Sequence, residues 1–157
     1  MEDEISFVRL TEIDPSEIAA HMSDPRLARH MPLLTADWDA KTASNFIIEK
    51  ERYWARDGLG HWAIMSRDRY VGWGGFQKEG DEWDFGLVLK PDAFGLGRRI
   101  MRRSIDFAIA DGRIPSVTFL LPPSRQNLGA LLKLGARHVG EIDHDGVKFM
   151  KFRLDTN

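Results

Sequence analysis

The spacing of apolar residues changes along this chain between alternation and a period near 3.6. Apolar and alternating segments predict strands at residues 5–10, 62–66, 70–76, 83–89, 117–121, 139–142 and 147–154. Amphipathic segments predict helices at residues 15–22, from residue 37 or 39 to about 56, from 95 to about 111, and around 128–134. The expected order is therefore β, α, α, β, β, β, α, β, α, β, β.

The connections between these segments indicate how the strands pair. Short polar breaks at residues 67–69 and 79–81 separate the three middle strands, which is typical of antiparallel hairpins. The strand–helix–strand segment at residues 87–121 favours a parallel crossover. We expect an α+β fold: one mixed, mostly antiparallel central sheet flanked by helices, in a single domain over residues 1–157.

Composition narrows the functional classes. The 157 residues are 43% hydrophobic and 29% charged, which is ordinary for a globular protein, and the net charge of −2 gives no reason to expect nucleic acid or a membrane as a partner. The chain has no cysteine, which excludes disulfides and a thiol nucleophile and suits a cytoplasmic location. No spacing of histidines and carboxylates indicates a metal site.

The turn after the strand at residues 85–89 carries the most specific chemistry. It contains Gly95 and Gly97, and the helix that follows opens with Arg98 and Arg99. Glycine lets a ligand approach the main chain closely, and the first N–H groups of a helix have no partner within it. Because these groups also carry the positive end of the helix dipole, the pattern favours phosphate binding. It is neither a Walker A loop nor a dinucleotide fingerprint.

At these residues the chain resembles the GNAT superfamily of N-acetyltransferases, and more narrowly the ribosomal-protein N-terminal (alanine) acetyltransferases. The resemblance covers nearly the whole chain, and it is strongest at Pro91, Phe94, Gly95, Gly97 and residues 131–135. It implies the GNAT fold and acetyl-CoA as cosubstrate, without a metal. It also implies direct transfer, in a ternary complex, of the acetyl group to a primary amine, either a protein N-terminus or a small molecule.

The resemblance also implies where the cosubstrate binds. Leu87, Val88 and Leu89 would offer main-chain groups to the pantetheine arm, as an added strand would. The pyrophosphate would be held by the main-chain amides of Gly95, Leu96, Gly97, Arg98 and Arg99. The arginines of this helix, Arg102 and Arg103 included, either approach phosphate oxygens or form a solvated helix face. Ser124 or Asn127 would bond the pantetheine amide or lie near the thioester.

For the general base we favour Asp84, acting through water, with Glu82 on the same face as the reserve candidate. The alternative is that Asp84 has only a structural role, as a carboxylate on the sheet surface paired with a neighbouring arginine. An N–H of Val88 or Leu89 would polarise the thioester carbonyl. Leu131 lies where many relatives carry a tyrosine general acid, so the leaving thiolate would take its proton from Ser124 or from water.

Aromatic and histidine side chains leave two interpretations open. Trp62, Trp73 and Trp83 either pack in the core or form a wall for the acceptor. His30 could line the acceptor entrance, but an isolated loop histidine is usually just exposed, and His61 and His138 are treated with the same caution.

Departures from the family pattern support a second function. Asp92 replaces the usual Gln or Arg, Ser124 and Asn127 are exchanged relative to the pattern, and Ala136 replaces a phenylalanine. A CoA-binding sensor or interaction module that has lost catalysis is therefore the alternative, and a purely structural domain is a third. Exposed sheet edges make a homodimer plausible.

Overall fold

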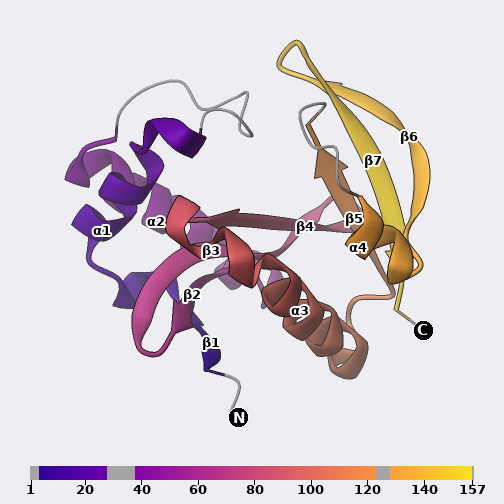
Figure 1. Cartoon of the computed structure of the whole chain (residues 1–157), viewed down its shortest axis with the longest axis horizontal. Coiled ribbons are helices and arrows are strands. Elements are labelled where there is room, and N and C mark those ends of the chain that lie inside the picture. The colour runs from indigo at the N-terminus through magenta and orange to yellow at the C-terminus, as the bar shows by residue number, and fades with distance from the viewer. Residues whose placement is uncertain (1–3, 28–37, 123–127, 157) are drawn as a thin grey trace.

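The computed structural model describes residues 4–27, 38–122 and 128–156. One sheet of seven strands, in the order β1-β2-β3-β4-β5-β7-β6, organises the described chain (Figure 1). Its strands are β1 Ile5–Arg9, β2 His61–Ser66, β3 Arg69–Glu79, β4 Glu82–Leu89, β5 Ser116–Leu121, β6 Arg137–His144 and β7 Val147–Asp155. Neighbouring strands are antiparallel except β4 and β5, which are parallel. The predicted mixed, mostly antiparallel sheet is confirmed.

The helices also follow the predicted order. They are α1 Pro15–Met22, α2 Ala40–Asp57, α3 Gly97–Asp111 and α4 Gly129–Lys133, with short 3-10 turns η1 Leu10–Glu12, η2 Pro25–Leu27 and η3 Pro91–Leu96. The helix predicted from Gly95 begins at Gly97 instead. Pro91 opens η3, where the Ala93 N–H bonds the Lys90 carbonyl at 2.8 Å, so a tighter turn precedes α3.

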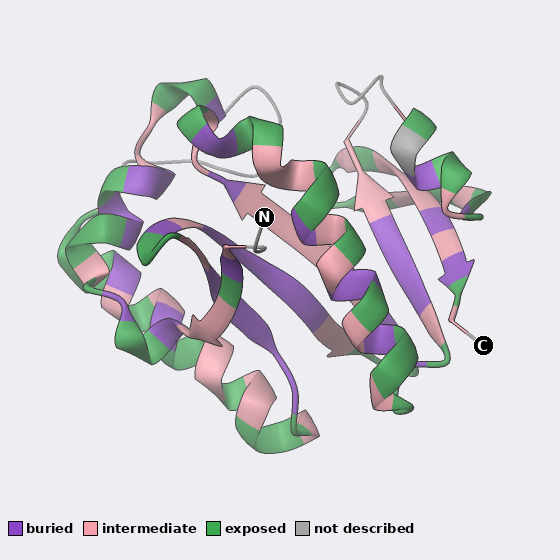
Figure 2. Cartoon of the chain, turned by 60° about the horizontal axis from the view of Figure 1, so that its bottom comes forward, coloured by how far each residue is buried: buried purple, intermediate pink, exposed green. Residues whose placement is uncertain are grey.

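Helices cover both faces of the sheet. α3 packs on one face through Ile105 and Ala108, against a core that contains Phe76 and Phe85. On the opposite face, α1 and α2 pack against a second core around Trp73. Buried positions lie on the strands and on the inner sides of the helices (Figure 2).

The sheet divides where its two halves meet. β4 and β5 pair only at Trp83↔Val117, Asp84↔Thr118 and Phe85↔Phe119. Beyond Phe85, β4 continues to Leu89 in pairs with β3, while β5 continues with β7. Figure 1 shows the two strands diverging toward their carboxyl ends. The predicted parallel crossover is confirmed, but the parallel pair is short.

Two glycines of β3 lie opposite the diverging part of β4. A Cβ on Gly74 would overlap the carbonyl oxygen of Gly86, and a Cβ on Gly72 would overlap that of Val88. Only glycine therefore allows this close approach of the two backbones. We infer that the tight β3–β4 contact keeps the end of β4 with β3 while β5 turns away.

The core on the α3 face predicts a stability experiment. Phe76 is fully buried and its ring contacts those of Trp62, Phe85 and Phe107. Phe76→Ala should lower the free energy of unfolding by about 3–5 kcal/mol in urea denaturation, because it leaves a cavity. Ile109→Ala, on the 55% exposed side of α3, is the control and should change it by less than about 0.5 kcal/mol. Equal losses in the two variants would contradict this description of the core.

Candidate functional site

The divergence of β4 and β5 creates an open strand edge. Gly86 to Leu89 pair with β3 on one side, and no residue of β5 pairs with them on the other. The side chains of Leu87, Val88 and Leu89 pack into the cores on the two faces of the sheet. The exposed edge is therefore main chain, which an extended ligand can pair with as an added strand does.

The N-terminus of α3 lies next to the end of this edge. A Cβ on Gly97 would lie 3.7 Å from Leu89 Cδ1, an ordinary contact, and a Cβ on Gly95 would meet no described atom within 4 Å. Neither glycine has a positive φ. The fold itself therefore needs glycine at neither position, although glycine within a helix is less stable than alanine by about 0.5–1 kcal/mol.

What these glycines provide is close access to the main chain at the start of α3. The Gly97 N–H donates to the Phe94 carbonyl of η3, so the 3-10 turn takes up one of the first donors. No side chain of the described residues caps the first turn of α3, and that turn contains no acidic residue, so the positive end of this 15-residue helix is not offset by a nearby carboxylate of that turn. Open main chain of this kind suits a phosphate group.

Cations extend the site along α3. A hollow of about 140 Å³ between α3 and α4 is lined by Arg98, Met101, Arg102, Lys133 and Leu134. Arg98 and Arg102 are one helical turn apart and face this hollow together. Arg103 instead lies over the ring of Phe7, and Arg99 is exposed outside the lining. Lys133 is a cation of this site that the sequence interpretation missed.

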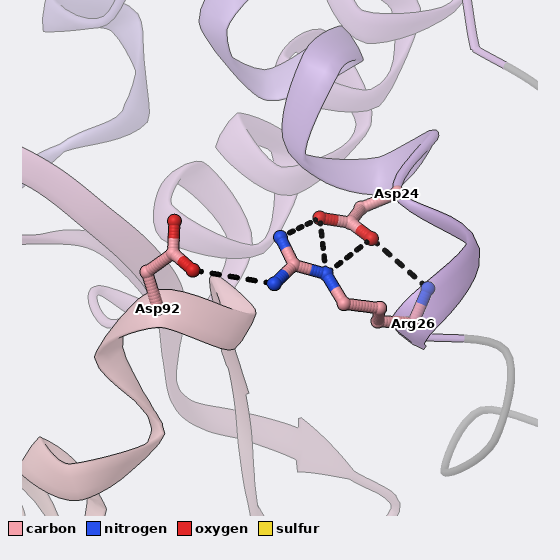
Figure 3. Close-up of polar contacts among 3 residues, drawn as sticks. All are labelled: Asp24, Arg26 and Asp92. Carbon is pink, nitrogen blue, oxygen red and sulfur yellow. Dashed lines mark hydrogen bonds and ion pairs between the residues drawn. The ribbon is translucent and has the colours of Figure 1, made fainter.

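Asp92, the unexpected acidic residue of the turn, has a cationic partner. The Arg26 guanidinium of η2 lies 3.3 Å from Asp92 and 2.7 Å from Asp24 (Figure 3). Arg26 bonds Asp24 through Nε and Nη2 and Asp92 through Nη1, so one guanidinium serves both carboxylates. The hydrogen bonds from Arg26 lower the pKa of Asp24 to about 2. The side chain of Asp92 is 82% exposed and points toward Arg26. Its charge is therefore partly offset from outside the helix.

The candidate base lies where the sheet begins to divide. Asp84 pairs in register with Gln77 on β3 and with Thr118 on β5. The Thr118 hydroxyl donates a hydrogen bond to Asp84 Oδ1 at 3.1 Å. Burial raises the pKa of Asp84 to about 7, opposed by the Thr118 bond and supported by the nearby charges of Glu79 and Glu82. Asp84 can therefore exchange a proton near neutral pH.

Glu82, the reserve candidate, is already engaged. Its Oε1 lies 2.6 Å from Lys151 Nζ, and its side chain is more exposed than that of Lys151. This ion pair directs the Glu82 carboxylate toward Lys151 of β7. The structure thus distinguishes the two carboxylates that the sequence left as alternatives.

Lys50 of α2 reaches the same face of the sheet. Its Nζ donates to Gln77 Oε1 at 3.0 Å and lies 5.0 Å from the ring centre of Trp73. Burial lowers the pKa of Lys50 to about 8, against the opposing effects of Glu79 and Asp84. Trp73 therefore lines this polar cluster, whereas Trp62 and Trp83 are core residues of the other face.

His61 is the residue that the sequence interpretation misjudged. It was grouped with loop histidines that are usually exposed, but it is the first residue of β2 and only 6% exposed. Neither ring nitrogen has a hydrogen-bond partner among the described residues. Had the predicted strand begun one residue earlier, at His61, the alternation of side chains along a strand would have placed His61 on the same buried face as Ala63.

Other candidates are absent from this site or outside the described residues. Ser124, Asn127 and His30 fall in segments that the structure does not describe. Leu131 is 6% exposed and packs in the core of the α3 face. Its side chain has no proton to donate, so this position supplies no general acid. His138 is exposed.

A larger hollow, of about 520 Å³, lies at the end of α2 beside the β3–β4 turn. It shares no lining residue with the α3 turn or with Asp84, and Arg56 within it already bonds Asp57 and the Lys78 carbonyl. We therefore place the functional site at the divergence of β4 and β5.

Metal ligands and membrane-spanning helices were the remaining possibilities among the described residues. These residues contain no group of three or more side chains suited to hold a metal ion. No helix among them has both the length and the apolar character needed to cross a membrane.

Comparison with known families and solved structures identifies the family and the fold of the chain. Residues 5–136 match the family described as the acetyltransferase (GNAT) domain. Comparison with curated protein sequences gives no match.

Among solved structures, the spermidine N-acetyltransferase from Vibrio cholerae, in complex with CoA and spermine, superposes with a TM-score of 0.76 at 7% identity, over 99% of this chain and 97% of that one. The ribosomal-protein-S5-alanine acetyltransferase from Vibrio fischeri superposes with a TM-score of 0.76 at 13% identity, over 98% and 92%. An aminoglycoside acetyltransferase in complex with coenzyme A gives 0.72 at 11%, over 96% and 93%. At these identities the likeness concerns the fold.

The raised pKa of Asp84 predicts how stability varies with pH. The folded chain keeps a proton on Asp84 up to about pH 7, whereas the unfolded chain releases it near the ordinary value of 3.8. The contribution of Asp84 to stability therefore falls as pH rises from about 4 to 7. Relative to the unmodified protein, Asp84→Asn should gain stability over that range, by at most about 4 kcal/mol, and level off above it.

Urea denaturation at pH 4, 5, 6, 7 and 8 measures this difference. Asp81→Asn, at the exposed β3–β4 turn, is the control and should show no such trend. A difference between Asp84→Asn and the unmodified protein that is constant with pH would show that the pKa of Asp84 is not raised.

Proposed function

Because the chain belongs to the GNAT family of acetyltransferases, we propose that it transfers an acetyl group from acetyl-CoA to a primary amine in a ternary complex. The observation that carries the proposal is the juxtaposition of the open β4 edge with the uncapped N-terminus of α3. The first suits an extended chain of amides, and the second suits a diphosphate. Acetyl-CoA carries both groups in sequence.

The residues of this chain would divide the binding of the cosubstrate. The main chain of Leu87, Val88 and Leu89 would pair with the pantetheine amides. The amides of the turn and first helical residues, Gly95, Leu96, Gly97, Arg98 and Arg99, would hold the pyrophosphate. Arg102 and Lys133 add positive charge in the hollow that Arg98 also lines. The glycines matter here because a Cβ would occupy the space through which phosphate oxygens approach.

The chemistry needs a neutral amine at the thioester. An α-amine, with a pKa of about 7.7–8.0, loses its proton near neutral pH far more easily than a lysine at about 10.4. Asp84, with a pKa of about 7, is matched to accept that proton directly or through one water. The amine nitrogen then attacks the carbonyl carbon and releases its second proton to water, the C–S bond breaks, and the sulfur leaves with the electron pair.

Two further roles complete the reaction. An N–H of Val88 or Leu89 on the open edge would stabilise the negative charge that develops on the carbonyl oxygen. The leaving thiolate has an ordinary pKa near 8.5, so water or the Ser124 hydroxyl suffices as the proton donor. The buried Leu131 takes no part in this step. Asn127 is proposed for the pantetheine amide.

The acceptor is proposed as an α-amine of a protein N-terminus or of a small molecule. Support comes from the match between Asp84 and the pKa of such amines. The solved structures of similar fold include proteins named for spermidine, ribosomal-protein alanine and aminoglycosides. These names support an amine as the acceptor, and only ribosomal-protein alanine is an α-amine.

The proposed phosphate site predicts the effect of closing it. Gly97→Glu places bulk and a negative charge at the first position of α3, so acetyl-CoA affinity measured by isothermal titration calorimetry should fall at least about tenfold. Ala110→Glu, exposed near the other end of the same helix, adds the same charge and should leave the affinity nearly unchanged. Unchanged affinity in Gly97→Glu would place the pyrophosphate elsewhere.

The proposed base predicts a separation of turnover from binding. Asp84→Asn should lower kcat by about 10²–10⁴-fold in an assay of thiol release with a panel of α-amines, while acetyl-CoA affinity stays the same. In the unmodified protein, kcat should rise with pH through an apparent pKa near 7. Glu82→Gln should retain most of the turnover.

A larger loss of kcat in Glu82→Gln than in Asp84→Asn would show that Glu82, and not Asp84, is the general base. Tight acetyl-CoA binding without turnover on any amine would instead favour a CoA-binding module that lacks catalysis.

A further inference from the structure

The imidazole of His61 has no role in the chemistry derived above. His61 pairs in register with Gly75, which pairs with Gly86 on the next strand. The ring of His61 reaches across this row, because a Cβ on Gly86 would lie 3.6 Å from its Cε1 and 3.8 Å from its Nε2. The ring therefore lies over Gly86 of β4, although it comes from β2.

Gly86 marks the point at which the site opens. It is the first residue of β4 beyond the last pair with β5, Phe85↔Phe119. It is also two residues from Asp84, so the two lie on the same face of the strand, about 7 Å apart along it. The imidazole and the candidate base therefore flank the beginning of the open edge from one side of the sheet.

The ring is buried with its hydrogen-bonding capacity unused. A neutral imidazole has one donor and one acceptor nitrogen, and both are buried in His61 without a partner among the described residues. Leaving such groups unpaired is unfavourable. The contrast is His21, also buried, whose Nδ1 lies 2.7 Å from the Tyr70 hydroxyl.

The neighbours of His61 leave the ring neutral and without an internal partner. The Trp73 ring lies 5.5 Å away, centre to centre, and offers an apolar contact. Lys50 is the charged group that acts on it, and its ammonium donates to Gln77 instead. Burial and this positive charge hold the pKa of His61 well below its ordinary value. An uncharged ring nitrogen with a lone pair is thus left without a donor among the described residues, and a ligand N–H that enters beside Gly86 would supply one.

We propose that His61 accepts a hydrogen bond from the acceptor amine and holds its nitrogen against the thioester carbonyl beside Gly86. This inference rests on the proposed function and deepens it, because it assigns the acceptor subsite to the face shared by His61, Asp84 and Trp73. His61 neither gains nor loses a proton. The first proton of the ammonium form goes to Asp84. One of the two remaining N–H groups bonds to His61 and directs the nitrogen lone pair at the carbonyl carbon, and the other N–H proton leaves to water after attack.

Two CoA derivatives test the proposal without knowledge of the acceptor. Alkylation of the CoA sulfur with N-methylchloroacetamide gives a ligand with an amide N–H next to a carbonyl. Alkylation with 1-chlorobutan-2-one gives an ethyl ketone of nearly the same shape, in which a CH2 group replaces the N–H. If His61 accepts the N–H, the amide should bind roughly two- to tenfold more tightly than the ketone by calorimetry. His61→Phe should abolish this preference, and His61→Gln, which keeps an acceptor oxygen, should retain part of it.

A second readout uses the unmodified protein. In ¹⁵N-labelled protein, the unprotonated ring nitrogen of His61 should shift on adding the amide and much less on adding the ketone. The signals of His21 and His138 should stay in place. Equal affinities and equal shifts with both ligands would overturn the proposal. If CoA binds tightly but neither derivative binds, the proposal is also overturned. Failure of CoA itself to bind would overturn the proposed function, and this inference with it.

Discussion

The short parallel pairing between β4 and β5 determines what the rest of the structure can do. Three pairs join the two halves of the sheet, and beyond them β4 stays with β3 while β5 stays with β7. In a continuous sheet, a neighbouring strand would bond the main chain on both sides of Gly86 to Leu89. Here β3 pairs on one side and β5 does not pair on the other. Because η3 and α3 follow directly after Leu89, the open edge leads to the uncapped helix N-terminus. An extended polar arm and an anionic group can thus bind along one path.

The face of the sheet toward α2 combines groups that titrate in different ranges. Burial raises the pKa of Asp84 to about 7, lowers that of Lys50 to about 8 and keeps His61 neutral. All three follow from desolvation, which disfavours the charged form of each group. A carboxyl ready to accept a proton next to a neutral imidazole suits an acceptor that arrives as an ammonium ion and reacts as an amine. In the proposed reaction, Asp84 accepts the proton and His61 positions the amine nitrogen.

The sequence predicted the fold well because its signals are local. Alternation, proline and glycine at segment ends, and the crossover at residues 87–121 were enough for the order of helices and strands along the chain, the hairpins and the parallel pair. The position of β7 between β5 and β6 in the sheet was not predicted. The early end of the parallel pair, after Phe85↔Phe119, was not predicted, because no local pattern in the sequence marks where β5 leaves β4. Asp84 was predicted from its place on the strand, but its pKa depends on burial that no local pattern encodes. His61 was missed for the same reason, and the Arg26–Asp92 contact joins residues 66 positions apart.

The central claim is that the open edge of β4 and the start of α3 bind one ligand together. Hydrogen–deuterium exchange of the full chain, with and without acetyl-CoA, tests it most directly. The account predicts that acetyl-CoA slows exchange in two segments at once, residues 86–89 and residues 95–99, and leaves the β3–β4 turn at Gly80 unchanged. Slowed exchange at the end of α2 and the β3–β4 turn, with neither of those two segments affected, would contradict it.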